Sequence, residues 1–200
     1  MPINATGYFN CLRSYLNTSG YEITTRDNGR IVLKEKVYWP GETKPKDHLV
    51  RLPFSGDVIV IRLDLKNQRG NPDPLFHFLD DESKPWAKRC DFVIFQLLNG
   101  GLNVYCIELK SASLPDSLVD QLDSSEAWCK ALHSIIKLYT NKEREFNLRK
   151  FVFSCMEDPS AYLDADDYLR RDHTIRHFHY DELKELTLEE LVNDNVEVIG

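Results

Sequence analysis

Inward and outward positions alternate with a period of two over residues 31–38, and short apolar runs recur along the chain up to residue 156. Two apolar runs, 90–98 and 102–109, flank Asn99, Gly100 and Gly101. An Asn-Gly pair between apolar runs is the strongest short-range signal for a tight β-turn, so this stretch predicts a β-hairpin. Similar runs predict further strands over residues 21–26, 30–38, 48–52, 57–65, 149–156, 174–180 and 196–199.

Helical periodicity appears before and after this hairpin. Residues 5–18 place apolar side chains at helical spacing, and residues 116–139 carry a longer apolar stripe that follows a Ser-Leu-Pro-Asp helix start. Shorter helices are expected over 74–79, 164–171 and 181–193. This order of helices and strands predicts an α/β (α+β) fold.

Length and composition indicate one globular domain over residues 1–200, with a core at about 57–156 and a C-terminal extension at 157–200. Apolar residues make up 42% of the chain, yet no run is long enough for a membrane span, and no secretory signal appears. The five cysteines form no CxxC pair, which favours reduced thiols, a cytoplasmic location and no structural zinc. The net charge of −7 argues against a strong autonomous nucleic-acid binder, and suggests delivery of any such substrate by a protein partner or a local basic patch.

The hairpin brings three charged side chains together. If Asn99-Gly100 is the turn, Asp91 lies directly opposite Glu108, with Cβ atoms about 5 Å apart. If Gly100-Gly101 is the turn instead, Asp91 faces Lys110 and lies diagonal to Glu108, still on the same face. Two opposed carboxylates repel each other, and a hard cation such as Mg²⁺, which prefers oxygen ligands, removes that penalty.

Asp91, followed by Glu108-Leu109-Lys110 at the end of the next strand, resembles the motif of the PD-(D/E)XK nuclease superfamily. The resemblance covers roughly residues 90–139. It implies a restriction-endonuclease-like αβββαβ core, in which a central mixed sheet is flanked by helices. It also implies that Asp91, Glu108 and the carbonyl of Leu109 bind Mg²⁺ or Mn²⁺, and that Lys110 assists the attacking water. The chain departs from the family pattern at Cys90, where a proline is usual, and in lacking an extra acid on the first helix.

Other residues are candidates for accessory roles. Gln121 lies on the long helix, where some branches of the family place a glutamine near the active site; a polar surface position is the simpler interpretation. The segment before Asp91 offers contacts to nucleic acid, because cations can bind phosphates and an indole can stack on a base. Its candidate residues are Lys84, Trp86, Lys88 and Arg89. The alternative is a solvated loop with Trp86 folded onto the core.

Two further groups of side chains are open to a functional interpretation. Asp57 also opens a strand and Asp64 follows it, but no E-x-K motif comes at hairpin distance, which favours a turn aspartate. His173, His177 and His179 could hold a transition metal, although isolated strand histidines are more often surface or partly buried residues.

The sequence therefore predicts a Mg²⁺-dependent nuclease that acts on DNA rather than RNA, as an anti-phage defence effector or a subunit of a complex. A homodimer is a further expectation from the resemblance, since small nucleases of this type often pair to cut both strands. One alternative is an inactive nuclease-fold scaffold or regulatory subunit, favoured by the net charge of −7. The other is an RNase, which no residue distinguishes from a DNase.

Overall fold

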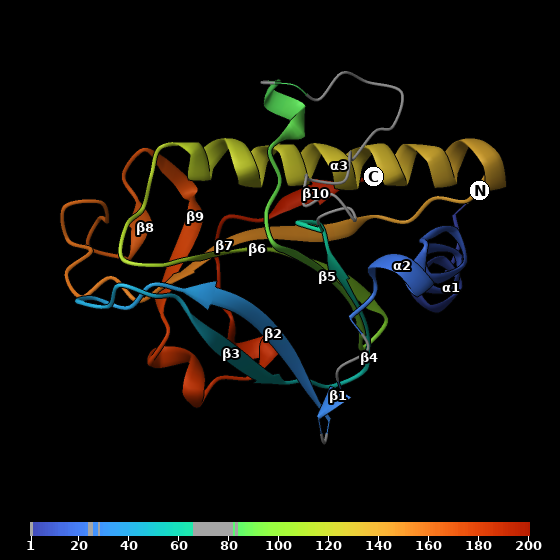
Figure 1. The fold of residues 1–200 in the computed structure, drawn as a ribbon. Helices are drawn as coiled ribbons and strands as arrows, with labels where there is room; N and C mark the ends of the chain where they lie inside the picture. The colour runs from blue at the N-terminus through green and yellow to red at the C-terminus, as the bar shows by residue number, and fades with distance from the viewer. Residues whose placement is uncertain (1, 24–25, 28, 66–81, 83) are drawn as a thin grey trace.

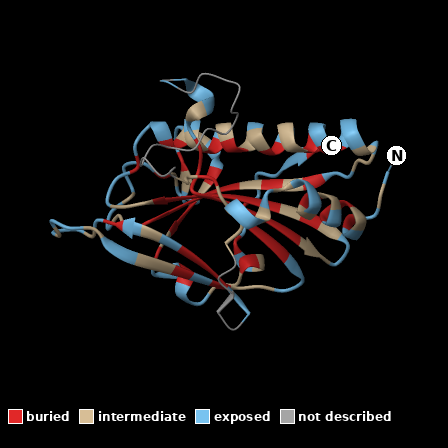
Figure 2. Cartoon of the chain, turned by 45° about the vertical axis from the view of Figure 1, so that its right-hand side comes forward, coloured by how far each residue is buried: buried red, intermediate tan, exposed pale blue. Residues whose placement is uncertain are grey.

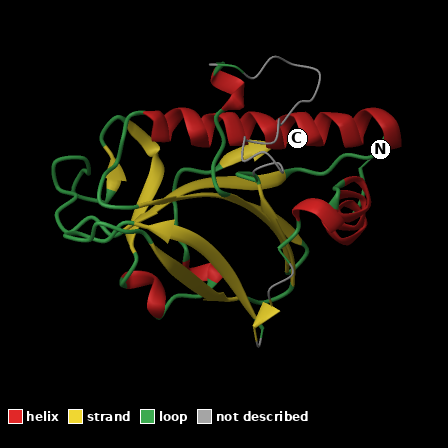
Figure 3. Cartoon of the chain, in the orientation of Figure 1, coloured by secondary structure: helices red, strands yellow, loops and turns green. Residues whose placement is uncertain are grey.

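The computed structural model describes residues 2–23, 26–27, 29–65, 82 and 84–200. Within them, one large mixed sheet has the strand order β4-β5-β6-β7-β9-β8, with β10 pairing β7 (Figure 1). A smaller sheet, β1-β2-β3, lies against it. Figure 3 shows that the structure contains both helices and β-sheets, and this mixture agrees with the predicted α/β class. The short helix expected over 74–79 lies outside the described residues.

The predicted hairpin is confirmed. Strand β5 (Phe92–Leu98) pairs antiparallel with β6 (Gly101–Lys110), and Leu98 lies opposite Gly101. The turn residues Asn99 and Gly100 have φ angles of 50° and 75°, as a type I′ turn requires. Asn99-Gly100 is therefore the turn, and of the two registers considered it is the one that puts Asp91 opposite Glu108.

The hairpin continues into a meander and a crossover. Strand β4 (Asp57–Arg62) pairs antiparallel with β5. After β6 comes α3 (Ser117–Thr140), which leads to β7 (Phe146–Ser154), a strand parallel to β6. Parallel neighbours require such a long connection, and here α3 supplies it along one face of the sheet (Figure 1).

Both faces of the large sheet are covered, so the strands between them are largely buried (Figure 2). On one face, α1 (Ala5–Tyr15) and α3 pack against apolar side chains such as Val93, Val104 and Val152. Ile94 and Ile107 point to the other face, under the smaller sheet.

The smaller sheet contains β1 (Arg26–Asp27), β2 (Arg30–Val37) and β3 (Lys46–Pro53). The helix expected over 5–18 ends at Tyr15, because Leu16 is extended, and α2 (Thr18–Tyr21) follows as a separate short helix.

The C-terminal part adds strands to the same sheet. Strand β9 (Asp172–His179) pairs parallel with β7, while β8 (Tyr168–Leu169) and β10 (Glu197–Ile199) are short. Residues 157–200 therefore share the sheet of the central residues.

Two of the expected helices are wrong. Residues 164–171 form turns and β8, and Asp167 has a left-handed φ of 60°, which a helix does not allow. Residues 181–193 form two 3₁₀ helices, η2 (Glu182–Lys184) and η3 (Leu188–Glu190). The extended Thr187 separates them and caps the second, so a continuous amphipathic helix does not form.

Gly56, in the turn before β4, should resist substitution far more than Gly100. Both glycines have a positive φ, which costs a side-chain-bearing residue about 1–2 kcal/mol. An added Cβ at Gly56 would also overlap the carbonyl oxygen of Leu97, whereas one at Gly100 meets no described atom. Gly56→Ala is expected to lower the free energy of unfolding by at least about 1 kcal/mol more than Gly100→Ala, measured by urea denaturation. Equal losses would contradict the described turn.

All five cysteines are free, and all but Cys11 are buried, as the scattered apolar contexts predicted. No helix in the described part of the chain combines the length and the apolar character that a membrane crossing needs.

Candidate active site

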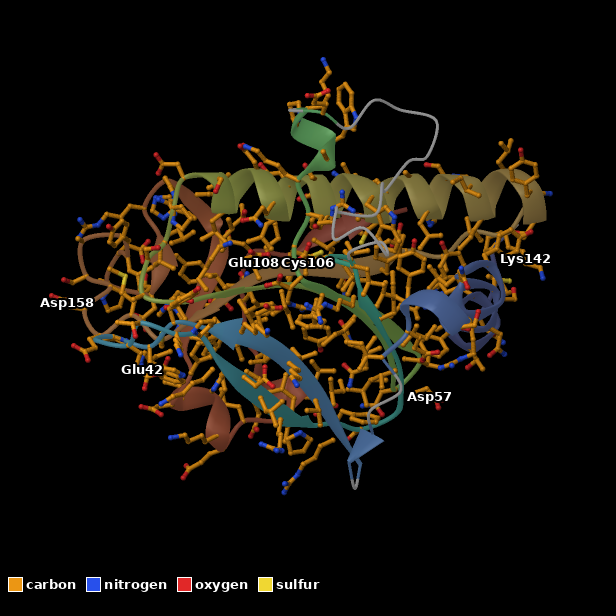
Figure 4. All side chains as sticks on the ribbon, viewed as in Figure 1. Glu42, Asp57, Cys106, Glu108, Lys142 and Asp158 are labelled. Carbon is orange, nitrogen blue, oxygen red and sulfur yellow. The ribbon has the colours of Figure 1, made fainter. Side chains whose placement is uncertain are left out.

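Asp91, Glu108 and Lys110 lie together where β5 begins and β6 ends. The backbone N–H of Asp91 donates to Oε2 of Glu108 at 3.0 Å, and the Lys110 ammonium pairs with Oε1 of the same carboxylate. Alternation along the strands places all three side chains on the face that α3 covers. Figure 4 shows Glu108 in the middle of the molecule, below α3.

Both carboxylates are taken out of water. Asp91 is 6% exposed and Glu108 is 2% exposed. Burial raises the pKa of both carboxyl groups above the ordinary range, and the Glu108 charge raises the pKa of Asp91 further. The neighbouring Lys110 ammonium opposes this rise in the pKa of Glu108. Two acids this close and this buried strongly favour sharing a proton or binding a cation.

Leu109 connects the two strands at the site. Its backbone N–H donates to Oδ2 of Asp91 at 2.7 Å, so it points toward β5. The N–H and C=O groups of one strand residue face the same neighbour, which directs the carbonyl of Leu109 toward Asp91 as well.

Gln121 reaches the site from the second turn of α3. Its Oε1 accepts a hydrogen bond from the Lys110 ammonium at 2.9 Å, and its Nε2 donates to the backbone carbonyl of Arg89 at 3.3 Å. The side chain thus links the lysine to the segment just before Asp91. The surface interpretation of Gln121 does not describe this position, since the residue is half-buried between β6 and η1 (Pro85–Ala87).

Two further acids lie near the pair, and sequence reasoning missed one of them. Glu35, on β2, forms an ion pair with Arg62 at 2.9 Å, and its charge raises the pKa of Asp91. The charge of Asp64, beyond β4, raises the pKa of Glu108. A signal for Glu35 existed, because it interrupts the otherwise apolar inward face of β2, which Leu33 and Val37 share.

Tyr180 fixes the backbone of the lysine. Its hydroxyl donates to the carbonyl of Lys110 at 3.0 Å, and burial raises its pKa well above the usual range. Its ring packs on His48, with centroids 4.2 Å apart, and on Trp39 at 5.9 Å. Residues from the smaller sheet and from the C-terminal part therefore meet beside Lys110.

Only some of the candidate nucleic-acid contacts in the segment before Asp91 are exposed to solvent. Lys84 and Trp86 are exposed, and Lys88 pairs with Asp120 of α3. Arg89 is 6% exposed and donates to the carbonyl of Ala87 at 3.1 Å, so little of its guanidinium is open to a ligand.

Asp57, the other acid that opens a strand, lies away from the cluster. Asp57 pairs with Leu97, at the opposite end of the strands from Asp91, and Figure 4 shows it far from Glu108.

The three histidines have different neighbours. The buried His177 lies 2.8 Å from Ser154 Oγ, His173 pairs with Asp164, and His179 lies 3.7 Å from Asp181. Among the residues that the structure describes, no three His, Cys, Asp or Glu side chains are placed to hold a metal ion.

Comparison of the chain with protein-family models, with curated proteins and with solved structures found no match. The chemistry of the site is therefore argued from its own residues. These are the two buried carboxylates of Asp91 and Glu108, which repel each other when both are ionised, the Lys110 ammonium paired with Glu108, and the Gln121 amide that accepts a hydrogen bond from that ammonium.

Proposed function

We propose that this chain is a Mg²⁺-dependent nuclease of the PD-(D/E)XK type, which hydrolyses phosphodiester bonds in DNA. The observation that carries the proposal is the hydrogen-bonded cluster of Asp91, Glu108 and Lys110 on one face of the sheet. The order of a helix, an antiparallel meander, a long helix and a parallel strand also agrees with the αβββαβ core of that superfamily.

The residues present fit a magnesium ion. Mg²⁺ typically binds one or two carboxylates and keeps waters or substrate phosphate oxygens as its other ligands, so two carboxylates and a carbonyl are enough. Asp91, Glu108 and the carbonyl of Leu109 would hold it. The raised pKa values of both acids support this fit, because a bound cation offsets the cost of ionising two buried carboxyl groups together.

A divalent cation bound here would lower the pKa of a water molecule and stabilise the negative charge that develops on the phosphate. The Lys110 ammonium, held between Glu108 and Gln121, would orient the attacking water and supply a proton at Nζ. Glu108 and the carbonyl-bound Tyr180 keep Lys110 in place. The apolar residues beneath the site exclude bulk water and strengthen these interactions.

The direct test is cleavage of plasmid DNA, of linear duplex and of RNA by the purified chain with Mg²⁺, with Mn²⁺ and with a chelator. Metal-dependent cleavage of DNA is expected, together with a heat of Mg²⁺ binding in calorimetry. If neither cleavage nor metal binding occurs, the chain is better described as an inactive scaffold or regulatory subunit. Preferential cleavage of RNA would make it an RNase.

Gln121 is expected to act as a positioning residue for Lys110. Gln121→Ala removes the acceptor for the lysine ammonium and should lower kcat by about tenfold with little change in KM, the order that a misplaced proton-transfer group costs. Gln121→Glu keeps an acceptor at the same place and should restore most of kcat. If both variants match the wild type in steady-state cleavage, the contact has no role in positioning.

A further inference from the structure

The outer face of the smaller sheet is basic in an otherwise acidic protein. Alternation along β2 and β3 buries Leu33 and Val50 against the large sheet and turns their neighbours outward. The charged residues on this outer face are Arg30, Lys34, Lys36, Arg51 and Asp47. On β2 and β3, four cations and one carboxylate give the outward side chains a net charge of three positive, whereas the whole chain carries −7.

Most of this charge is not neutralised by neighbours. Lys34 pairs with Asp47 at 2.7 Å. Arg30, Lys36 and Arg51 form no ion pair with any residue in the described ranges, and all three are exposed. The nearby lysines also lower the pKa of Asp47, which indicates a locally positive potential.

The same strand reaches the candidate active site. Glu35, between Lys34 and Lys36, points inward, and its negative charge raises the pKa of Asp91. Beyond the end of β2, the backbone N–H of Tyr38 donates to Ser111 Oγ, one residue after Lys110, at 2.9 Å. The end of β2 therefore lies beside the site, while the side chains of Lys34 and Lys36 point to the outer face.

A hollow of about 270 Å³ extends the basic face along the edge of β3. Arg30, Arg51 and Lys184 line it, together with the rings of His48 and Tyr180. Burial is the main cause that lowers the pKa of His48, and the charges of Lys184 and Arg51 lower it further, while Asp181, which pairs with Lys184 at 2.6 Å, opposes them. Phosphate groups favour this combination of exposed cations beside aromatic rings.

We propose that the outer face of β2 and β3, continued by this hollow, binds the sugar–phosphate backbone of the DNA that the site of Asp91, Glu108 and Lys110 cleaves. The identity of the polyanion rests on the proposed nuclease function. Charge complementarity selects the occupant, because no other sheet face described above combines three unneutralised cations with a strand that ends beside the site.

The test is fluorescence anisotropy of a labelled DNA duplex over a range of salt concentrations, with Ca²⁺ in place of Mg²⁺ to limit cleavage. Arg30→Ala/Arg51→Ala should weaken binding by about tenfold or more and reduce the salt dependence, log K against log [salt], by about 2. The control is Lys130→Ala/Lys137→Ala, which removes the same charge from α3, on the opposite face of the large sheet.

Unchanged affinity and salt dependence in the Arg30/Arg51 variant would overturn the proposal, and so would an equal loss in the control or an absence of wild-type binding. A single-stranded DNA and an RNA of the same sequence are measured in parallel. Tighter binding of RNA through the same two arginines would assign the face to RNA and overturn the choice of DNA.

Cleavage measured separately with Mg²⁺ distinguishes this proposal from the proposed function. If the wild type cleaves DNA but the arginine substitutions leave binding intact, the nuclease assignment stands and the basic face fails. If DNA binds through the two arginines but is never cleaved, the face stands and the nuclease assignment fails.

Discussion

Lys110→Ala is expected to slow Mg²⁺-dependent cleavage of DNA by about a thousandfold, within the range that a general acid or base contributes. The ammonium pairs with Glu108 and is held by Gln121, so its removal takes away the only lysine that reaches the carboxylate pair within the described residues. It also leaves Glu108 buried without its cation, which raises the pKa of that carboxyl further. Single-turnover cleavage of a labelled duplex measures the effect.

The matched control is Lys137→Ala on α3. Lys137 forms an ion pair with Glu143 at 2.7 Å, and this pair lies away from the candidate site. This variant should cleave at the wild-type rate. Circular dichroism verifies that the Lys110 variant is folded before its rate is interpreted. A Lys110→Ala rate within a few-fold of the wild type would show that the lysine takes no part in the reaction, or that the activity comes from a contaminant.

The second large effect concerns stability without metal. Asp91→Asn is expected to raise the free energy of unfolding at about pH 8 and to change it little at about pH 5. In the wild type, the folded state holds protons on Asp91 and Glu108 that the unfolded state releases from about pH 4 upward, so the folded state loses stability as pH rises through the raised pKa values. The gain is about 1.4 kcal/mol for each pKa unit of penalty removed.

The asparagine keeps an oxygen that accepts the hydrogen bond from the N–H of Leu109, so the local geometry is retained. Thermal melts across pH, with and without Mg²⁺, measure both effects: the ion should stabilise the wild type at high pH and leave Asp91→Asn unchanged. Asp57→Asn, at the exposed opposite end of the strands, serves as the control and should show no pH-dependent gain. A variant destabilised at every pH, or one that Mg²⁺ stabilises like the wild type, would contradict the assigned carboxylate pair.

The central part of the site could be predicted because its geometry is local. The Asn99-Gly100 turn determines the register of β5 and β6, and that register alone places Asp91 opposite Glu108. The helical stripe on α3 was equally visible, and it brings Gln121 toward Lys110.

The remaining parts of the site depend on packing between distant segments. Glu35 reaches Asp91 only because the smaller sheet covers the large one, and Tyr180 reaches Lys110 only because β9 extends the sheet beyond β7. The pattern of β2 marks Glu35 as an inward acid, but it does not show which residue that acid meets, and no local pattern marks the contact of Tyr180. The failed helix over 181–193 has a local cause, since the extended Thr187 interrupts an amphipathic pattern that looks continuous in the sequence.

The arrangement of two carboxylates around a divalent cation is tested most directly by anomalous diffraction from crystals of the protein soaked in Mn²⁺. The structure leads us to expect one strong peak at about 2.0–2.3 Å from carboxylate oxygens of both Asp91 and Glu108, with the carbonyl of Leu109 as a further ligand and Lys110 beside it. A peak elsewhere, or none at this cluster while it is open to solvent in the crystal, would contradict a metal-dependent nuclease site built on these residues.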